Sequence, residues 1–192
     1  MKLMSKELSE MSLEELWQLF PIFLCEHKSE WNDFYYEMET FLKDKLKDYR
    51  IVRISHIGST AIKTIWAKPI IDILVEIDKS EDINIVGKAI ENIGFIKMHE
   101  EKNWISFNKG YSKEGFEEKV YHLHLRYEGN NDELYFRDYL IDNPEVAKEY
   151  EKLKLSLWKK YEHNRDAYTD AKTDFIKENT IKAKILYKDR YK

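Results

Sequence analysis

The chain has 192 residues, enough for one domain of ordinary size with a substantial buried core. Hydrophobic residues make up 43% and charged residues 35%, a mixture that excludes an extended disordered region. The formal net charge of -4 argues against bulk nucleic acid as a partner, and the single cysteine, Cys25, excludes an intrachain disulfide and a cysteine-based zinc site. The charged N-terminal stretch MKLMSKELSEMSLEEL lacks the apolar segment of a signal peptide, and no run reaches the roughly 20 apolar residues of a membrane span. We therefore expect a cytoplasmic protein without membrane contact.

The chain opens with two predicted helices. Ser12 and Glu15 have the spacing of a capping box ahead of an apolar stretch, which predicts a first helix that Pro21 bends or interrupts. Apolar residues then recur at helical spacing from Trp31 to Leu46 and predict a second helix over about 29–48, with one buried face.

Two strands are predicted next. The β-branched segment RIVRISHIGS begins at Arg50 and predicts one strand, and the run PIIDILVEI predicts a buried second strand. Alternation along the second strand separates two sets of side chains. One face carries Ile71, Ile73 and Val75, and the other carries Asp72, Leu74 and Glu76.

The rest of the chain predicts more strands and then helices. A helix over about 82–92 precedes strands near 95–98, 104–108 and 119–127, which complete a sheet of four or five strands. The segment NKGYSKEGFEEK, at 108–119, contains two glycines and many charges and is predicted to be a solvent-facing hairpin loop. Helices are then predicted over 133–141, 144–161 and from about 166 onward. We expect one domain over residues 1–192.

The most informative stretch is HIGSTAIKTIWAKPIIDILVEI, residues 56–77. A strand that ends in Gly58 and Ser59 and leads into a helix can offer backbone N–H groups and a hydroxyl to a phosphate. Glycine also permits close approach of a ligand to the backbone. Taken alone, the Gly-Ser pair is more typical of a structural turn.

Asp72 lies within an otherwise apolar strand, where an unpartnered carboxylate is costly to bury. It therefore needs a metal ion, a cation or a place at the open edge of the core. Glu76 points to the same side but lies about 13 Å further along the strand, too far to share one ion unless the strand bends. Lys68 could balance Asp72 or meet a phosphate, or could equally lie in solvent.

The segment YHLHLRY places two histidines, His122 and His124, on one side of a predicted strand. Such a pair could bind a metal ion, relay a proton or contact an anion, or it could belong to a polar, half-exposed sheet face. If this strand neighbours that of Asp72, the imidazoles and the carboxylate share one face of the sheet.

Two helical segments add further candidates. In DAYTDAKTDFI, Tyr168 and Lys172 share a helix face and could contact a ligand, although a tyrosine there more often packs in the core and a lysine more often lies in solvent. In YFRDYL, Arg137 and Asp138 could form an intramolecular salt bridge.

Several motifs in order resemble the GrpB family, namely HIGSTAI, KPIIDILV, HLHL, FRDYL with NPEVAKEYEKLK, and RDAYTDAKTDFI, over about residues 50–178. This family is similar to the polymerase-beta-like nucleotidyltransferases. The resemblance implies an α+β, nucleotidyltransferase-like fold, a small mixed β-sheet flanked by helices with N-terminal and C-terminal helical segments. It also implies a nucleoside triphosphate with its phosphates on the turn at Gly58 and Ser59, Mg²⁺ at Asp72, and a small-molecule acceptor. Active members of the superfamily carry a second acid where this chain has Leu74.

These motifs define three sets of candidate site residues. The candidate catalytic residues are Asp72, His122 and His124. The candidate metal ligands are Asp72 and Glu76. The candidate nucleotide-binding residues are His56, Gly58, Ser59, Thr60, Lys68, Arg137, Tyr168 and Lys172.

Three interpretations of function remain open, together with the identity of the acceptor and the oligomeric state. The first is transfer of a nucleotidyl group from a nucleoside triphosphate to the acceptor, with one Mg²⁺ or with Glu76 as an added ligand. The second is a nucleotide- or metal-binding regulatory module without turnover, which Leu74 favours. The third is a protein-interaction scaffold, for which 13 Tyr, 9 Phe and 5 Trp provide aromatic surface.

Overall fold

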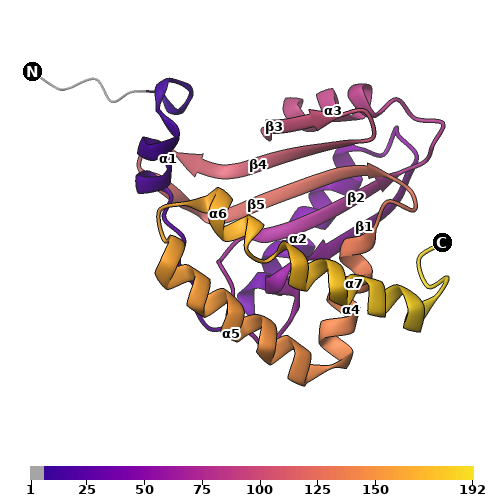
Figure 1. Ribbon diagram of the computed structural model, residues 1–192. Helices are drawn as coiled ribbons and strands as arrows, with labels where there is room; N and C mark the ends of the chain where they lie inside the picture. The colour runs from indigo at the N-terminus through magenta and orange to yellow at the C-terminus, as the bar shows by residue number, and fades with distance from the viewer. Residues whose placement is uncertain (1–6) are drawn as a thin grey trace, which may run out of the picture.

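The computed structural model describes residues 7–192 as a five-stranded β-sheet flanked by helices (Figure 1). Residues 1–6, which begin the charged segment compared above with a signal peptide, lie outside the described residues. The first elements are a 3₁₀ turn η1 (Leu8–Glu10), helix α1 (Leu13–Leu19) and helix α2 (Glu30–Lys45). Ser12 Oγ accepts a hydrogen bond from the backbone N of Glu15 at 3.2 Å, and the Glu15 carboxylate accepts one from the backbone N of Ser12 at 2.8 Å. The predicted capping box is confirmed.

The sheet has the order β1-β2-β5-β4-β3. Of its four neighbouring pairs, only β2 and β5 are parallel. The strands are β1 (Ile51–Ile57), β2 (Ile71–Ile77), β3 (Ile96–Glu101), β4 (Trp104–Ser112) and β5 (Gly115–Tyr127). In the parallel pair Asp72 lies opposite His122, and Leu74 lies opposite His124. The carboxylate and both imidazoles therefore share one face of the sheet, as hypothesised from the alternation of the two strands.

Helices cover both faces of the sheet. The main core packs α2 and the helix α3 (Ile83–Asn92) against Ile71, Ile73 and Val75 of β2. The helices that follow β5 lie on the other side (Figure 1), where Leu74 packs against Leu134. They are α4 (Asp132–Asp142), α5 (Pro144–Tyr161), α6 (Arg165–Asp170) and α7 (Thr173–Tyr187). Residues 7–192 contain no helix that combines the length and apolar character needed to cross a bilayer.

The predicted loop over 108–119 is wrong, because β4 and β5 continue through most of it as a paired hairpin. Tyr111 pairs with Phe116 across the hairpin, and the ring of Phe20 packs on both at centroid distances of 4.9 and 5.1 Å. This aromatic contact buries the end of the hairpin, which the many charges of the segment did not indicate. Gly110, at φ +90°, lies at an irregularity in the strand register, typical of a β-bulge.

Two predicted helices also differ. The helix expected after Gly58 is a single 3₁₀ turn, η2 (Ser59–Ala61), because the following β-branched residues favour extended backbone and the Thr60 hydroxyl bonds the Ile70 carbonyl at 3.1 Å. The final helix, predicted as one from 166, is two helices. The break leaves Lys172 between α6 and α7.

Candidate functional site

The turn after β1 lies directly on Asp72. Gly58 has φ +71°, and a Cβ atom added there would lie 2.2 Å from Asp72 Oδ2. Glycine is therefore needed both for the left-handed backbone conformation and for the close approach of the turn to the carboxylate. The Asp72 side chain keeps 27% of its surface exposed, so a ligand can reach it from solvent.

Asp72 is in contact with both histidines of β5. Its Oδ1 atom lies 3.4 Å from His122 Nδ1 and 3.8 Å from His124 Nε2. On the far side of the first imidazole, Nε2 lies 2.7 Å from the Tyr111 hydroxyl and 3.3 Å from Arg165 Nη2. Because a guanidinium can only donate, this Nε2 accepts, and His122 is neutral with its proton on Nδ1, facing Asp72.

The pKa values of this group follow from the same contacts. Burial lowers the pKa of His122 to about 4, although Asp72 opposes the shift. Burial alone would raise the pKa of Asp72, but hydrogen bonds from His122 and His124 outweigh it and hold this pKa well below its usual range. The pair is therefore a carboxylate and a neutral imidazole at neutral pH.

A lysine from α5 reaches the turn as well. Lys154 Nζ donates to Ser59 Oγ at 3.0 Å and also to the Trp66 carbonyl. This residue is only 2% exposed. Lys154 thus places a buried positive charge beside the predicted phosphate-binding hydroxyl.

Two more lysines frame the ring of Tyr168, which is itself buried. The Nζ atoms of Lys68 and Lys172 lie 5.5 and 4.5 Å from the centre of this ring. These distances are typical of cation–π contacts. The structure therefore brings together three predicted candidates, Lys68, Tyr168 and Lys172, from segments about 100 residues apart.

Four cations thus gather around one carboxylate, and we call this group the cationic pocket. It consists of Lys68, Lys154, Arg165 and Lys172, with Asp72 and Ser59. None of the ion pairs within residues 7–192 joins any of these four cations to a carboxylate. Burial, reinforced by the neighbouring cations, lowers the pKa of Lys68 and of Lys154 to about 7 and that of Lys172 to about 8. Asp72 opposes all three shifts, and Glu151 also opposes that of Lys154. A lowered lysine pKa means that the protonated side chain is destabilised at this site, and a bound anion can stabilise it.

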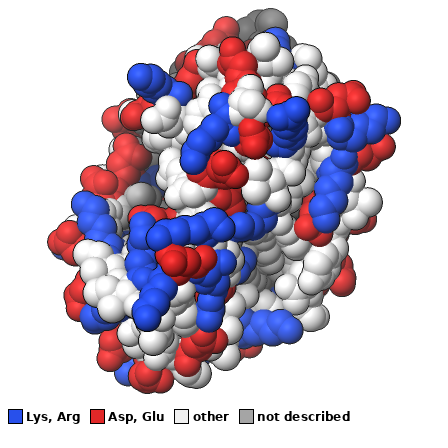
Figure 2. Space-filling model, turned by 90° about the vertical axis from the view of Figure 1, so that its right-hand side faces the viewer, with Lys and Arg blue, Asp and Glu red and all other residues white. Residues whose placement is uncertain are grey.

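One face of the molecule has a different charge arrangement. On the face of the molecule shown in Figure 2, Lys and Arg are interspersed with Asp and Glu. Charges of opposite sign offset one another there, whereas those of the cationic pocket do not.

His56 and Thr60 lie inside the fold next to the turn. His56 Nε2 lies 3.0 Å from Thr60 Oγ1, and the Thr60 hydroxyl donates to the Ile70 carbonyl, so the imidazole donates to the hydroxyl. The His56 ring also stacks on Tyr35 at 4.8 Å. These two predicted nucleotide-binding residues hold the turn in place through contacts within the protein.

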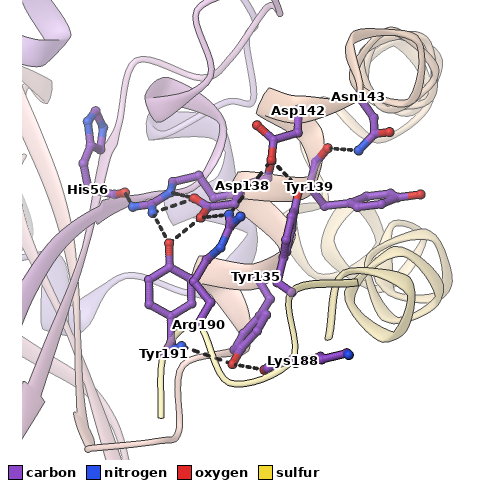
Figure 3. A network of polar contacts seen from close by, with 11 residues as sticks. His56, Tyr135, Asp138, Tyr139, Asp142, Asn143, Lys188, Arg190 and Tyr191 are labelled. Carbon is purple, nitrogen blue, oxygen red and sulfur yellow. Dashed lines mark hydrogen bonds and ion pairs between the residues drawn. The ribbon is translucent and has the colours of Figure 1, made fainter. Parts of the chain in front are cut away.

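Arg137 belongs to a second group of charges, which we call the C-terminal cluster. It consists of Arg137, Asp138, Asp142, Arg190 and Tyr191. Arg137 Nη2 donates to Asp138 Oδ1 at 2.7 Å and to the Tyr191 hydroxyl at 3.0 Å, and Nη1 donates to the His56 carbonyl at 2.8 Å. Arg190 pairs with the same carboxylate at 2.9 Å (Figure 3). Arg137 therefore makes the intramolecular salt bridge considered above and ties the chain end to β1.

Glu76 is also fully engaged away from the pocket. It is 1% exposed, and its carboxylate pairs with Arg53 at 3.2 Å. Asn131 Nδ2 and the backbone N of Gly129 donate to its other oxygen at 2.8 and 3.2 Å. The structure does not bring Glu76 to Asp72, so Glu76 cannot act there without a rearrangement of β2.

The donor set around Asp72 does not fit the two-ion magnesium site of active nucleotidyltransferases. Such a site needs several anionic oxygen ligands within a few ångströms. Leu74 occupies the position of the second acid and is fully buried against Ile57 and Leu134. Throughout the described range 7–192, no three His, Cys, Asp or Glu side chains are arranged to hold one metal ion.

Three residues of this site were not among the sequence candidates: Tyr111, Lys154 and Arg165. Tyr111 was assigned to the loop that the structure shows to be a strand. Lys154 carried a signal, because it follows Tyr150 by four residues on the buried face of α5. Arg165 carried one too, because it precedes Tyr168 by three residues.

Comparison with known proteins identifies relatives over most of the chain. The family described as GrpB protein matches residues 21–182. The glutamate-rich protein GrpB of Alkalihalophilus pseudofirmus is 33% identical over 168 residues, which cover 82% of this chain and 92% of that protein. The UPF0157 protein YqkA of Bacillus subtilis is 34% identical over 143 residues, covering 73% of this chain and 41% of that longer protein.

Solved structures agree with this assignment. The conserved protein GrpB from Enterococcus faecalis superposes with a TM-score of 0.74 at 30% identity, covering 86% of this chain and 99% of that one. The Cid1 poly(U) polymerase, solved bound to MgATP, superposes with a TM-score of 0.51 at 12% identity, covering 71% of this chain and 44% of that one. The second likeness concerns the fold alone and confirms the α+β, nucleotidyltransferase-like architecture implied by the motifs. The chain belongs to the GrpB family.

Proposed function

We propose that this protein binds a nucleoside triphosphate, with the phosphates held in the cationic pocket beside the turn at Gly58 and Ser59. One observation carries the proposal. Four cations from separate segments gather near this turn, where Lys154 contacts Ser59, and within residues 7–192 none of them forms an ion pair with either nearby carboxylate, Asp72 or Glu151. Buried charges in proteins are paired or bind a ligand, and a chain of phosphates supplies the missing negative charge.

The chemistry of the individual side chains suits this ligand. Arg165 offers a planar guanidinium for two phosphate oxygens, and Lys68, Lys154 and Lys172 act as point charges. The Ser59 hydroxyl, already bonded by Lys154 at 3.0 Å, can donate its proton to a phosphate oxygen. The nucleotidyltransferase-like fold supports the choice of a nucleotide over other phosphate compounds by analogy.

Leu74 favours a binding module that does not turn the nucleotide over. A phosphoryl-transfer site stabilises the growing charge of its transition state with carboxylate-bound metal ions, and on this face of β2 only Asp72 is available, since Leu74 is not an acid and Glu76 pairs with Arg53. A protein of this kind would report nucleotide levels through its stability or shape.

A second candidate is nucleotidyl transfer to a small acceptor, favoured by the contact between Asp72 and His122 at 3.4 Å. An imidazole that a carboxylate orients is a common general base. The acceptor hydroxyl would give its proton to an imidazole nitrogen, its oxygen would bond to the α-phosphorus, and the bond to pyrophosphate would break. His124 would take that proton, or His122 would take it on Nε2 after giving up its contacts with Tyr111 and Arg165.

The binding proposal is tested by thermal shift of the purified protein against the common nucleoside triphosphates, each with EDTA, Mg²⁺ or Mn²⁺. We expect at least one triphosphate to raise Tm, since ligand at 100 times its Kd adds about 2.7 kcal/mol of stability. The Asp72→Asn variant should keep or increase the shift, because it removes negative charge from the pocket. If no triphosphate moves Tm under any of the three conditions, the proposal is wrong.

The transfer candidate needs a separate measurement. Release of pyrophosphate from the stabilising triphosphate is followed in the presence of pooled small alcohols and amines. Turnover above the background of the His122→Ala and His124→Ala double variant would support transfer. Binding without turnover would support the binding module and reject the transfer candidate.

A further inference from the structure

The balance of charge in the cationic pocket bears on the metal dependence of its ligand. When all groups are ionised, four cations lie near two carboxylates, Asp72 and Glu151, and the second of these is already paired with Lys148 at 3.1 Å. At least two positive charges are therefore left without a partner. The cations come from three segments of the chain, since Lys68 precedes β2, Lys154 lies on α5, Arg165 begins α6 and Lys172 follows it.

A divalent ion would add to this imbalance. Mg²⁺ brings two more positive charges into a space that already holds an excess, and it removes two negative charges from the triphosphate that it binds. Its preferred ligands are oxygen anions in near-octahedral geometry. Asp72 is available for this role, whereas the oxygens of the neighbouring Glu151 already accept from the Trp66 backbone N at 2.7 Å and pair with Lys148 at 3.1 Å. The second acid position, Leu74, is 0% exposed and cannot supply another carboxylate.

His122 does not make up for the shortage of anionic metal ligands. The Nε2 atom of His122 faces the Tyr111 hydroxyl at 2.7 Å and Arg165 at 3.3 Å, so its lone pair is already accepting. Its Nδ1 carries the proton that faces Asp72. A metal ion would have to displace Arg165 to reach Nε2 of His122, or a proton to reach Nδ1.

From these observations we infer that the pocket binds its phosphate chain as a polyanion free of divalent metal, with lysine and arginine supplying the positive charge that Mg²⁺ supplies in metal-dependent relatives of the fold. The ligand class is a chain of phosphates with at least three negative charges. The inference rests on the proposed binding of a nucleoside triphosphate at this site and states the form in which that ligand enters.

The test compares inorganic tripolyphosphate with the nucleoside triphosphates on the full chain, in EDTA and in excess Mg²⁺. Calorimetry or thermal shift gives the apparent Kd in each of the four combinations. We expect tripolyphosphate and at least one nucleoside triphosphate to bind in EDTA, and excess Mg²⁺ to weaken both. Binding that requires Mg²⁺ or Mn²⁺ would overturn the inference and leave the proposed function standing.

The remaining outcomes separate the two ideas. Tripolyphosphate that binds in EDTA while every nucleoside triphosphate fails would support a metal-free phosphate pocket and reject the nucleotide function. No binding by any compound would reject both.

A matched pair of variants assigns the effect to the pocket. Lys172→Met removes one pocket cation and should weaken tripolyphosphate binding in EDTA about tenfold, because charge-assisted hydrogen bonds contribute on this scale. Lys177→Met removes an exposed lysine on α7 and should leave the Kd within about twofold. Equal effects of the two changes would show that general charge attraction, and not the pocket, accounts for the binding.

Discussion

The C-terminal cluster and the cationic pocket both contain partly buried charges, but they balance them differently. In the C-terminal cluster two cations, Arg137 and Arg190, meet the carboxylates of Asp138 and Asp142, with Arg190 at 2.9 and 3.9 Å from them. In the cationic pocket four cations lie near Asp72 and Glu151, and within residues 7–192 none of the four forms an ion pair with a carboxylate. A charge that is satisfied within the protein stabilises the fold, whereas one left unsatisfied costs stability and is retained for a ligand. Pairing therefore distinguishes the charges that hold the C-terminal segment from those that we propose bind a ligand.

The largest expected effect is at the centre of the C-terminal cluster. Asp138→Ala leaves two arginines and Tyr191 without their shared partner and should lower the free energy of unfolding by about 3 kcal/mol. Urea denaturation measures this loss. Asp142→Ala, at a side chain that is 52% exposed, is the control and should cost less than about 1 kcal/mol. The comparison fails if Asp138→Ala leaves stability unchanged.

The next effect concerns the turn on which the pocket is built. Gly58→Ala combines a left-handed backbone with a clash against Asp72 and should cost about 3 kcal/mol. Gly129→Ala is a matched control, since Gly129 has φ +83° but no atom within 4 Å of an added Cβ, and it should cost about 1 kcal/mol. Denaturation of both variants measures the difference. Equal losses would show that Asp72 does not press on the turn.

The smallest effect is the pH dependence of the ligand-free protein. Burial, helped by Arg165, Lys172 and Lys154 and opposed by Asp72, lowers the pKa of Lys68 to about 7. An unfolded lysine keeps its proton to about pH 10.4, so the unfolded state binds more protons above pH 7. Stability should therefore rise between about pH 7 and pH 9.5, by an amount on the order of 1 kcal/mol.

Thermal melts across this pH range, in buffers without phosphate, measure the rise. Lys68→Met should reduce it, and tripolyphosphate should reverse it, because a bound polyanion favours the protonated lysines. A decrease in the stability of the ligand-free protein as pH rises would contradict the conclusion that the lysines of the pocket lack carboxylate partners.

Local sequence patterns predicted the parts of the fold that depend on near neighbours. The capping box at Ser12 and the alternation along β2 were confirmed because a helix start and a strand face are set within a few residues. The loop prediction over 108–119 was wrong because the hairpin pairing there depends on Phe20, about 90 residues away. A local pattern does not contain that contact.

The site was predictable to the same extent. Asp72 and the turn at Gly58 were identified from one continuous motif. Lys154 and Arg165 were missed because their positions depend on how α5 and α6 pack over β2, although each lies at helical spacing from a tyrosine that faces the pocket.

The packing of Leu74 also determines whether a second metal-binding carboxylate could stand at this position. Leu74 fills a small apolar cluster with Ile57 of β1 and Leu134 of α4. An aspartate in its place would put a charge in a closed apolar space, so a single substitution would unfold the region before it created a metal ligand. An acid at position 74 would need compensating changes in β1 and α4 as well as in β2. The hydrophobic core of this chain thus disfavours a second carboxylate beside Asp72.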